Sequence, residues 1–316
     1  MKRITAPALI TVALMVTACG SAETGAQQET TTEPPSTAPV MPTSTTATTV
    51  ATTTTTQPPK TTTTTSASAG HGCEALHEPG EYEGLNVVGD LEQPYSVVVP
   101  EAYANVAPAP LYVNLASGSG SHDVFMSGWR PYLDDLPGLM VMVNTSRGAT
   151  PEQIGALIDQ LNTDYCIDAE QIHALGTSRS QGMVGTLACE QSDRIASIVT
   201  AIGSHRQSEE CNPDRPVPLL SFTGDGDRPA MTAQVETWAD LNGCNPEPLV
   251  EYLGSGIQRK AYQNCDADVL FYDIEGMGHA YPLHEAKGPA AGYVAEYEEV
   301  DYLEEVYEFS TQHPLP

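Results

Sequence analysis

Basic residues are scarce in this chain of 316 residues. Its 13 Lys and Arg stand against 41 Asp and Glu, which gives a formal net charge of −28. Only three residues of each sign precede residue 70, so the rest of the chain carries that whole charge. A field of this sign repels phosphate groups, and we therefore expect no nucleic-acid partner.

The N-terminus lacks an apolar run long enough to span a membrane. Lys2 and Arg3 precede an apolar stretch over residues 4–16, and small residues follow it. This order is typical of a secretory signal, here residues 1–18. The residues Val-Thr-Ala-Cys at 16–19 also resemble the lipobox of bacterial lipoproteins, which implies that Cys19 is acylated and tethers an extracellular protein to the membrane. The alternative is an ordinary signal peptide with an incidental cysteine.

Residues 19–70 contain almost no large apolar side chains and consist mainly of Thr, Ser, Pro and Ala. Such a segment buries too little surface to offset its ordering entropy, so we expect a disordered tether. Residues 71–316 remain, and their number suits a single domain. No internal repeat is visible in them.

The chain also lacks CxxC pairs, and no histidine stands at metal-ligand spacing from a cysteine, so we expect neither a metal site nor another cofactor. An even number of cysteines follows Cys19, and in an exported domain this predicts three disulfides. The six are Cys73, Cys166, Cys189, Cys211, Cys244 and Cys265.

Short apolar runs alternate with helical patterns along residues 71–316. The runs are continuously apolar rather than alternating, which is typical of strands covered on both faces. They lie at 95–99, 111–115, 139–143, 172–175, 195–202, 219–222 and 269–274, and the helical patterns lie at 152–161, 183–189, 231–241 and 293–309. Thr150 and Pro151 predict a cap and first turn for the first helix. The alternation predicts an α/β fold with a mostly parallel central sheet flanked by helices.

The residues IHALGTSRSQG at 172–182 predict a strand, a tight turn and the start of a helix. A serine on such a turn is held out of the sheet, with small residues two positions away on either side. Ser178 has Gly176 before it and Ser180 after it, so the motif is GxSxS rather than GxSxG. Ser180 is an alternative nucleophile because Gly182 follows it at the same spacing, but the register of the upstream strand favours Ser178.

A serine hydroxyl needs a base to become a nucleophile, and the base needs a carboxylate that orients it. Asp225 and Asp227 lie in the loop after the run at 219–222, and His279 lies in a glycine-rich loop after the run at 269–274. The order serine, acid, histidine is the order that α/β hydrolases use. The pattern predicts a catalytic triad with either aspartate as its acid.

These residues resemble the extracellular polyhydroxybutyrate depolymerase, feruloyl esterase and acetylxylan esterase-like group of α/β hydrolases. The resemblance rests on the stretches 164–168, 187–194, 215–220, 241–244 and 276–282. It implies the α/β-hydrolase fold, Ser178 as nucleophile, Asp227 rather than Asp225 as acid, and His279 as base. The backbone N–H groups of Gly118 and Arg179 would form the oxyanion hole.

The chain departs from this family at three places. Ala116 and Ser117 replace its His-Gly pair, Ser180 replaces the glycine after the nucleophile, and Tyr281 replaces a tryptophan. Trp129 and Tyr281 are candidates to line the substrate site, although Trp129 fits a plain core position equally well.

The resemblance implies a serine esterase that acts through an acyl-enzyme on polyester oligomers or on acyl or feruloyl esters of polysaccharide. We expect a monomer that contacts the membrane only through its lipid anchor. Two other readings stay open: a catalytically degenerate binding protein at the cell surface, and a serine peptidase of the same fold.

The positions of the cysteines, together with this resemblance, suggest one pairing among the fifteen that six cysteines allow. Cys189 with Cys211 would tie the nucleophile's helix to the strand before the acid. Cys244 with Cys265 would close an excursion before the histidine strand. The remaining pair, Cys73 with Cys166, would join the start of the domain to the turn before the nucleophile's strand.

Overall fold

The computed structural model describes residue 73 and residues 76–88, 91–116, 130–133, 136–145, 148–203, 211–254, 256–285 and 294–316. The expected signal segment, Cys19 and the expected tether lie outside the described residues, as do Gly118 and Trp129. Within the described part, no helix combines the length and the apolar character that a membrane crossing requires.

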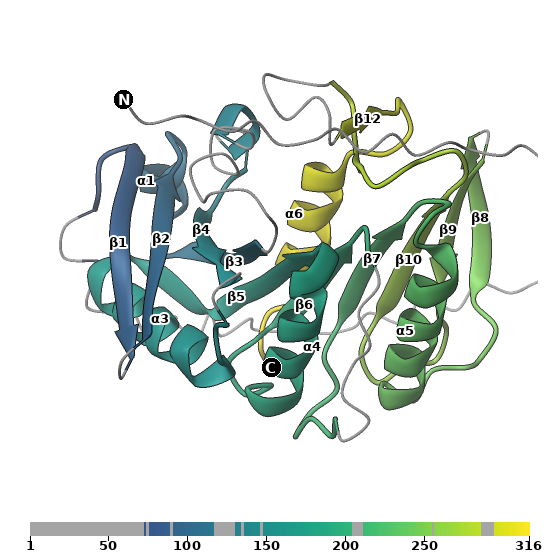
Figure 1. Ribbon diagram of the computed structural model, residues 1–316, viewed down its shortest axis with the longest axis horizontal. Helices are drawn as coiled ribbons and strands as arrows, with labels where there is room; N and C mark the ends of the chain where they lie inside the picture. Colours follow the sequence, from purple (N-terminus) through teal and green to yellow (C-terminus); the bar gives the residue numbers. More distant parts are fainter. Residues whose placement is uncertain are drawn as a thin grey trace, which may run out of the picture. The chain divides into compact units, whose positions relative to one another are not determined.

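A ten-stranded sheet runs through the described domain (Figure 1). The six neighbouring strands β4, β3, β5, β6, β7 and β10 pair in parallel, and the strands at both edges are antiparallel. The spatial order is β1 (Gly80–Val88), β2 (Leu91–Val99), β4 (Leu139–Asn144), β3 (Ala109–Ala116), β5 (Ile167–Thr177), β6 (Ser197–Ala201), β7 (Leu219–Thr223), β10 (Val269–Ile274), β9 (Ile257–Ala261) and β8 (Leu249–Gly254). The predicted parallel core of the sheet is confirmed.

All seven predicted strands are present, and the innermost ones are buried along their whole length. Every residue of β6, β7 and β10 is buried, as expected for strands covered on both faces. Strands β1, β8 and β9, which lie toward the edges of the sheet, were not predicted from the sequence. In β8, the edge strand, Leu249 is 65% exposed and Tyr252 is 72% exposed, so no continuous apolar run marks it.

Helices cover both faces of the sheet (Figure 1). Buried side chains of α3, α4 and α5 belong to one apolar core, and those of α6 belong to a second core on the opposite face. The helices whose bounds lie within the described residues are α1 (Tyr103–Val106), α3 (Pro151–Asp164), α4 (Gln181–Glu190), α5 (Arg228–Leu241) and α6 (Tyr302–Gln312). The predicted start of α3 is confirmed: Thr150 and Gln153 cap each other, and Pro151 is the first helical residue.

The helix predicted at 293–309 begins too early. Residues Val294–Glu296 form β12, which pairs in parallel with β11 (Tyr281–Leu283), and α6 starts only at Tyr302. The side chain of Asp301 accepts hydrogen bonds from the backbone N–H groups of Leu303 and Glu304. This cap satisfies the first-turn donors and sets the start of the helix, whatever apolar residues precede it.

Three disulfides fasten the domain. They join Cys73 to Cys166, Cys189 to Cys211, and Cys244 to Cys265, which are the pairs suggested above. The second bond connects the end of α4 to the segment before β7, and the third holds the excursion that contains β8 and β9. Such bonds stabilise a fold chiefly because they restrict the unfolded chain.

A buried histidine lies within β5. The ring of His173 bonds to Ser197 at 2.8 Å through Nδ1 and to Gln171 at 2.9 Å through Nε2, and it stacks on Tyr112. Burial lowers the pKa of His173 from 6.5 to about 3. The folded protein therefore keeps this imidazole neutral at pH values where the unfolded chain would bind a proton.

We predict that His173 contributes to acid destabilisation. Between pH 6.5 and about 3 the unfolded state holds one more proton at this site, so the free energy of unfolding falls as the pH is lowered through that window. The slope from this site alone is at most about 1.4 kcal/mol per pH unit. Denaturant unfolding at several pH values should give a flatter dependence for His173→Gln than for the wild type. The same series with His284→Gln, which changes a half-exposed histidine, controls for the loss of a histidine as such, and a change of slope equal to that of His173→Gln would contradict the role of His173.

Candidate active site

The turn after β5 holds Ser178 in a conformation that non-glycine residues rarely adopt. β5 ends at Thr177, a 3₁₀ turn spans Ser178–Ser180, and α4 begins at Gln181. Ser178 has a φ of 54°. A strained strand-to-helix turn of this kind presents the serine hydroxyl at the end of the sheet. The predicted strand, turn and helix are all present, with Ser178 on the turn.

Two glycines allow neighbouring backbone to approach this turn. A Cβ on Gly176 would lie 2.6 Å from Val184, so a larger residue would push α4 away from β5. A Cβ on Gly203, which has a φ of 133°, would lie 2.6 Å from Cα of Ser178. The N–H of Ser178 donates to the carbonyl of Ile202 at 2.6 Å. Gly203 was not predicted from the sequence, although a glycine directly after the apolar run at 195–202 is a usable signal.

The alternative serine, Ser180, is buried and bonded to backbone. It is 2% exposed, and its hydroxyl accepts the N–H of Thr177 at 2.9 Å. The same hydroxyl lies within bonding distance of the carbonyl oxygens of Thr177 and Leu115. Ser178 is only partly buried. This placement favours Ser178 as the nucleophile and gives Ser180 the role of tying the turn to the end of β3.

Asp227 and His279 meet at the ends of neighbouring parallel strands. Asp227 precedes the first residue of α5, in the loop after β7, and His279 lies in the loop after β10. Nδ1 of His279 lies 2.9 Å from Oδ2 of Asp227. Because an ionised carboxylate can only accept, Nδ1 carries the proton and Nε2 is left as the basic nitrogen. The side chain of His279 is 47% exposed.

Asp225 has other partners than His279. Its carboxylate accepts the N–H of Gly276 at 3.0 Å and pairs with Arg228 at 2.9 Å. Its own N–H donates to the carbonyl of Met277 at 2.9 Å. The geometry therefore favours Asp227 as the acid, and Asp225 fastens the two loops to each other.

Ser178, Asp227 and His279 all follow the carboxyl ends of parallel strands, so they share one edge of the sheet. Among the described residues, no hydrogen bond joins Ser178 to His279. Such catalytic bonds are often long without substrate and shorten in the reacting complex. Nowhere in the described part do three His, Cys, Asp or Glu side chains gather as a metal site would require.

One of the two expected oxyanion donors lies in the described chain. Arg179 is the second residue of the 3₁₀ turn, where N–H groups lack a helical partner and the helix dipole favours negative charge. Gly118, the other expected donor, lies beyond the end of β3 and outside the described residues. Trp129 also falls outside them.

Tyr281, which was expected to line the substrate site, lies in the core. It is 4% exposed, and its ring packs edge-on against Tyr302 with the centroids 5.0 Å apart. Its hydroxyl forms a hydrogen bond with the side chain of Thr177, and burial raises the pKa of Tyr281. Because Thr177 precedes Ser178, Tyr281 supports the turn from the side of β11.

Sequence comparison finds esterases among known proteins, and no family model matches the chain. Feruloyl esterase B of Piromyces equi is 28% identical over 148 residues, which make up 39% of this chain and 27% of that protein. A probable feruloyl esterase C of Aspergillus niger is 24% identical over 211 residues, or 60% of this chain and 77% of that protein. The chain thus spans only about a quarter of the Piromyces protein.

Structure comparison identifies the architecture. The acetyl xylan esterase of Aspergillus awamori superposes with a TM-score of 0.50 and 12% identity, over 63% of this chain and 94% of that structure. The chain has the α/β-hydrolase fold. At this identity the likeness is one of fold, and the chemistry has to be argued from the residues themselves.

We predict that substitution of Ser178 removes reactivity but not stability, and that substitution of Ser180 lowers stability but not reactivity. Ser178→Ala should abolish covalent labelling by a fluorophosphonate, because only an activated serine reacts, and it should leave the melting temperature near the wild-type value. Ser180→Ala should retain labelling but lower the free energy of unfolding by roughly 1–3 kcal/mol, because the buried N–H of Thr177 loses its partner. Labelling lost in Ser180→Ala but kept in Ser178→Ala would place the nucleophile two residues later.

We predict that Asp225 and Asp227, the two aspartates in the loop after β7, differ sharply in their effect on the reactivity of Ser178. Asp227→Asn should slow fluorophosphonate labelling of Ser178 by about 10³- to 10⁴-fold, because an amide cannot hold the imidazole in its reactive tautomer. Asp225→Asn should have a much smaller effect, because its partners are Gly276 and Arg228. Stopped-flow labelling rates test this directly, and equal losses in the two variants would refute the assignment of Asp227.

Proposed function

We propose that this chain is a serine carboxylic-ester hydrolase that works through an acyl-enzyme. The observation that carries the proposal is the contact of 2.9 Å between Asp227 and His279, at the same sheet edge as a serine with a φ of 54°. The likeness in fold to an acetyl xylan esterase and the sequence similarity to two feruloyl esterases support the same reaction class.

The residues divide the reaction among them in a definite way. Nε2 of His279 takes the proton from the Ser178 hydroxyl as the oxygen attacks the ester carbonyl, while Asp227 stabilises the imidazolium. The backbone N–H groups of Arg179 and Gly118 hold the tetrahedral oxyanion. His279 then protonates the departing alcohol, and water attacks the acyl-enzyme with the same imidazole as base. The acid is released and Ser178 regains its proton.

For the substrate we propose acyl or feruloyl esters of polysaccharide, with polyester oligomers as a further class. The names of the relatives favour the first class: one is a feruloyl esterase, another a probable feruloyl esterase, and one structural neighbour is an acetyl xylan esterase. Polyester oligomers rest only on the resemblance of the motifs.

We also propose that the protein works outside the cell as a lipid-anchored monomer, held through Cys19 and the segment 19–70. The three disulfides of the domain support an oxidising compartment. Sensitivity of membrane attachment to Cys19→Ala would test the anchor.

A substrate panel tests the proposed function. Wild-type protein should hydrolyse p-nitrophenyl acetate and, among natural-type substrates, release ferulate from methyl ferulate or acetate from acetylated xylan. Ser178→Ala should lose all of these activities to the level that a bare oxyanion hole provides. Faster cleavage of hydroxybutyrate oligomers would shift the substrate to polyester, and peptide anilide turnover above ester turnover would indicate a peptidase. A folded wild type that hydrolyses nothing and resists fluorophosphonate labelling would refute catalysis and leave a binding protein.

A further inference from the structure

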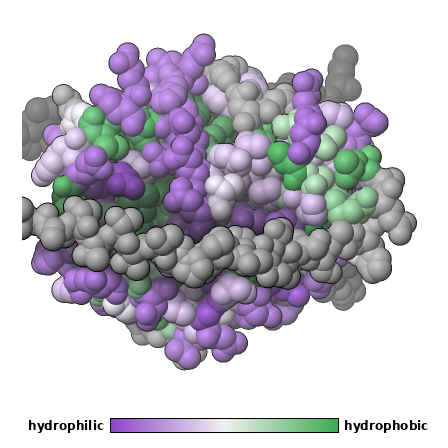
Figure 2. Space-filling model, turned by 180° about the vertical axis from the view of Figure 1, so that it is seen from behind, coloured by the Kyte–Doolittle hydropathy of each residue, from purple (hydrophilic) through white to green (hydrophobic). Residues whose placement is uncertain are grey.

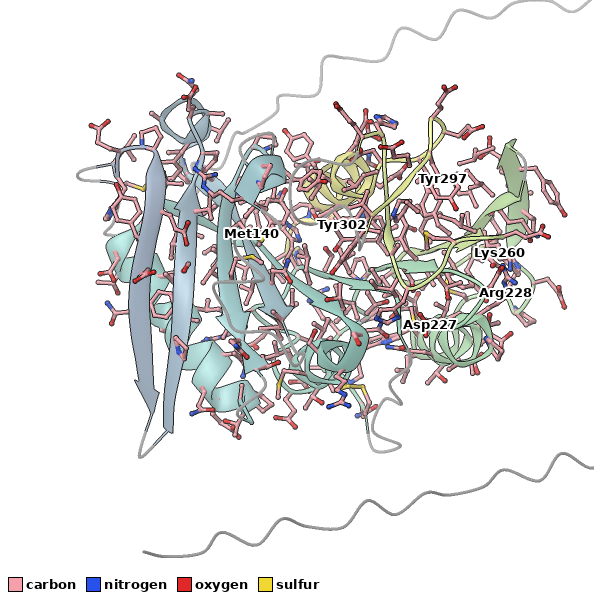
Figure 3. The ribbon with its side chains drawn as sticks, turned by 45° about the horizontal axis from the view of Figure 1, so that its top comes forward. Met140, Asp227, Arg228, Lys260, Tyr297 and Tyr302 are labelled. Atoms are coloured by element: carbon pink, nitrogen blue, oxygen red, sulfur yellow. A yellow bond between two sulfur atoms is a disulfide. The ribbon has the colours of Figure 1, made fainter. Side chains whose placement is uncertain are left out.

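Four charged side chains beside the acid and the base form a chain of alternating sign. The carboxylate of Asp225 accepts the N–H of Gly276 at 3.0 Å and the guanidinium of Arg228 at 2.9 Å. Nε of Arg228 donates to one oxygen of Asp273, and Lys260 donates to the other at 2.7 Å. Figure 3 shows Arg228 and Lys260 close together, with Asp227 on the same side of the domain.

This chain of charges connects the two loops of the candidate site. Arg228 follows Asp227 directly and is the first residue of α5. Asp273 lies in β10, the strand that leads to His279. Arg228 therefore bridges the loop of the acid to the strand of the base, and Asp225 extends the bridge to Gly276 in the base loop.

The two loops need such a connection because their glycine residues give the backbone additional conformational freedom. The loop after β7 that carries Asp227, here the acid loop, contains Gly224 and Gly226. The loop after β10 that carries His279, here the base loop, contains Gly276 and Gly278. Glycine loses more backbone freedom on ordering than any other residue, so the Asp227–His279 contact by itself is a weak restraint on both loops. A displacement of about 1 Å at a reacting group can lower a rate about 100-fold.

The loops also touch each other through backbone. Asp225 N–H donates to the Met277 carbonyl at 2.9 Å, and a Cβ on Gly224 would come within 2.0 Å of that same oxygen. Met277 is 1% exposed and anchors the middle of the base loop in the core. The carboxylate of Asp225 adds a second tie at Gly276, three residues before His279.

Burial differs along the charged chain and indicates what each link does. The side chain of Asp273 is 8% exposed, so its carboxylate needs both cationic partners. The hydrogen bond to Asp273 raises the pKa of Arg228, which keeps its charge throughout any assay range. The link from Arg228 to Asp225 is far more exposed, and exposed ion pairs contribute little stability. The ion pair of Arg228 with Asp225 therefore acts by holding the two loops in position rather than by adding stability.

We infer that Asp225 and Arg228 are positioning residues for the proposed reaction: together they hold the base loop so that His279 keeps its contact with Asp227. The inference rests on the proposed function. Neither residue touches the reacting atoms, and both act through His279.

Steady-state kinetics on p-nitrophenyl acetate tests this, with kcat expressed per site titrated by a fluorophosphonate. Asp225→Asn and Arg228→Met should each lower kcat about 10- to 100-fold while KM changes less than about 2-fold. Arg228→Lys should have an intermediate kcat, because one ammonium cannot reproduce the fork that reaches both carboxylates. The double variant should be about as slow as the slower single variant, because both side chains act through one contact.

Arg194→Met is the matched control. Its side chain is 32% exposed and pairs with Asp159 at 3.1 Å, against 35% exposure and 2.9 Å for Arg228 with Asp225. It lies after α4 and in neither loop, so kcat per titrated site should stay within about 2-fold of the wild type.

The outcomes separate the two proposals. Wild-type activity with kcat per site unchanged in Asp225→Asn and Arg228→Met would overturn the positioning role alone, and so would an equal loss in Arg194→Met. A lower melting temperature with unchanged kcat per site would make the charged chain purely structural. A folded wild type that neither turns over esters nor reacts with the probe would overturn the proposed function and the inference with it.

Discussion

The parallel pairing of β7 with β10 is the constraint on which the candidate site depends. The two strands stay in register from Leu219 and Val269 to Thr223 and Asp273, and neighbouring strands lie about 4.8 Å apart. The loops that follow therefore leave the sheet side by side. Asp227 and His279 are 52 residues apart in the chain, yet they meet because of this pairing. β5 joins the same edge through β6 and brings the candidate nucleophile with it.

Close backbone contact is the second requirement of the site, and it explains which small residues are needed. The absence of a side chain at Gly176 lets α4 approach β5. In the same way, Gly203 lets the segment after β6 approach Ser178, and Gly224 lets the base loop approach the acid loop. Ser180 stands where the family that the chain resembles has glycine. Its hydroxyl accepts the N–H of Thr177 and lies within bonding distance of the carbonyl oxygens of Thr177 and Leu115. The serine at position 180, which replaces the glycine of that family, thus stabilises the turn.

Although basic residues are scarce, several of them bind polar groups of the fold. Arg215 donates to the backbone carbonyls of Ser192 and Pro216, and Arg228 and Lys260 share the buried carboxylate of Asp273. Acidic residues are left in large excess, and hydrophilic side chains dominate the face in Figure 2 outside the grey atoms. Arg215, Arg228 and Lys260 thus bind polar groups of the fold, while the excess negative charge of the chain favours its solubility.

The sequence by itself determined the buried parallel strands, because continuous apolar runs have few other uses, and it determined the order of serine, acid and histidine. It did not reveal the edge strands, because they lack a continuous buried run, as the four successive exposed residues of β8 show. Nor did it reveal the start of α6, which Asp301 sets through a cap. It also left Asp225 and Asp227 equivalent in pattern. The family resemblance favoured Asp227, but only the tertiary structure showed which partner each carboxylate has, because the direction of a loop side chain depends on residues distant in the sequence: Gly276 for Asp225, and His279 for Asp227.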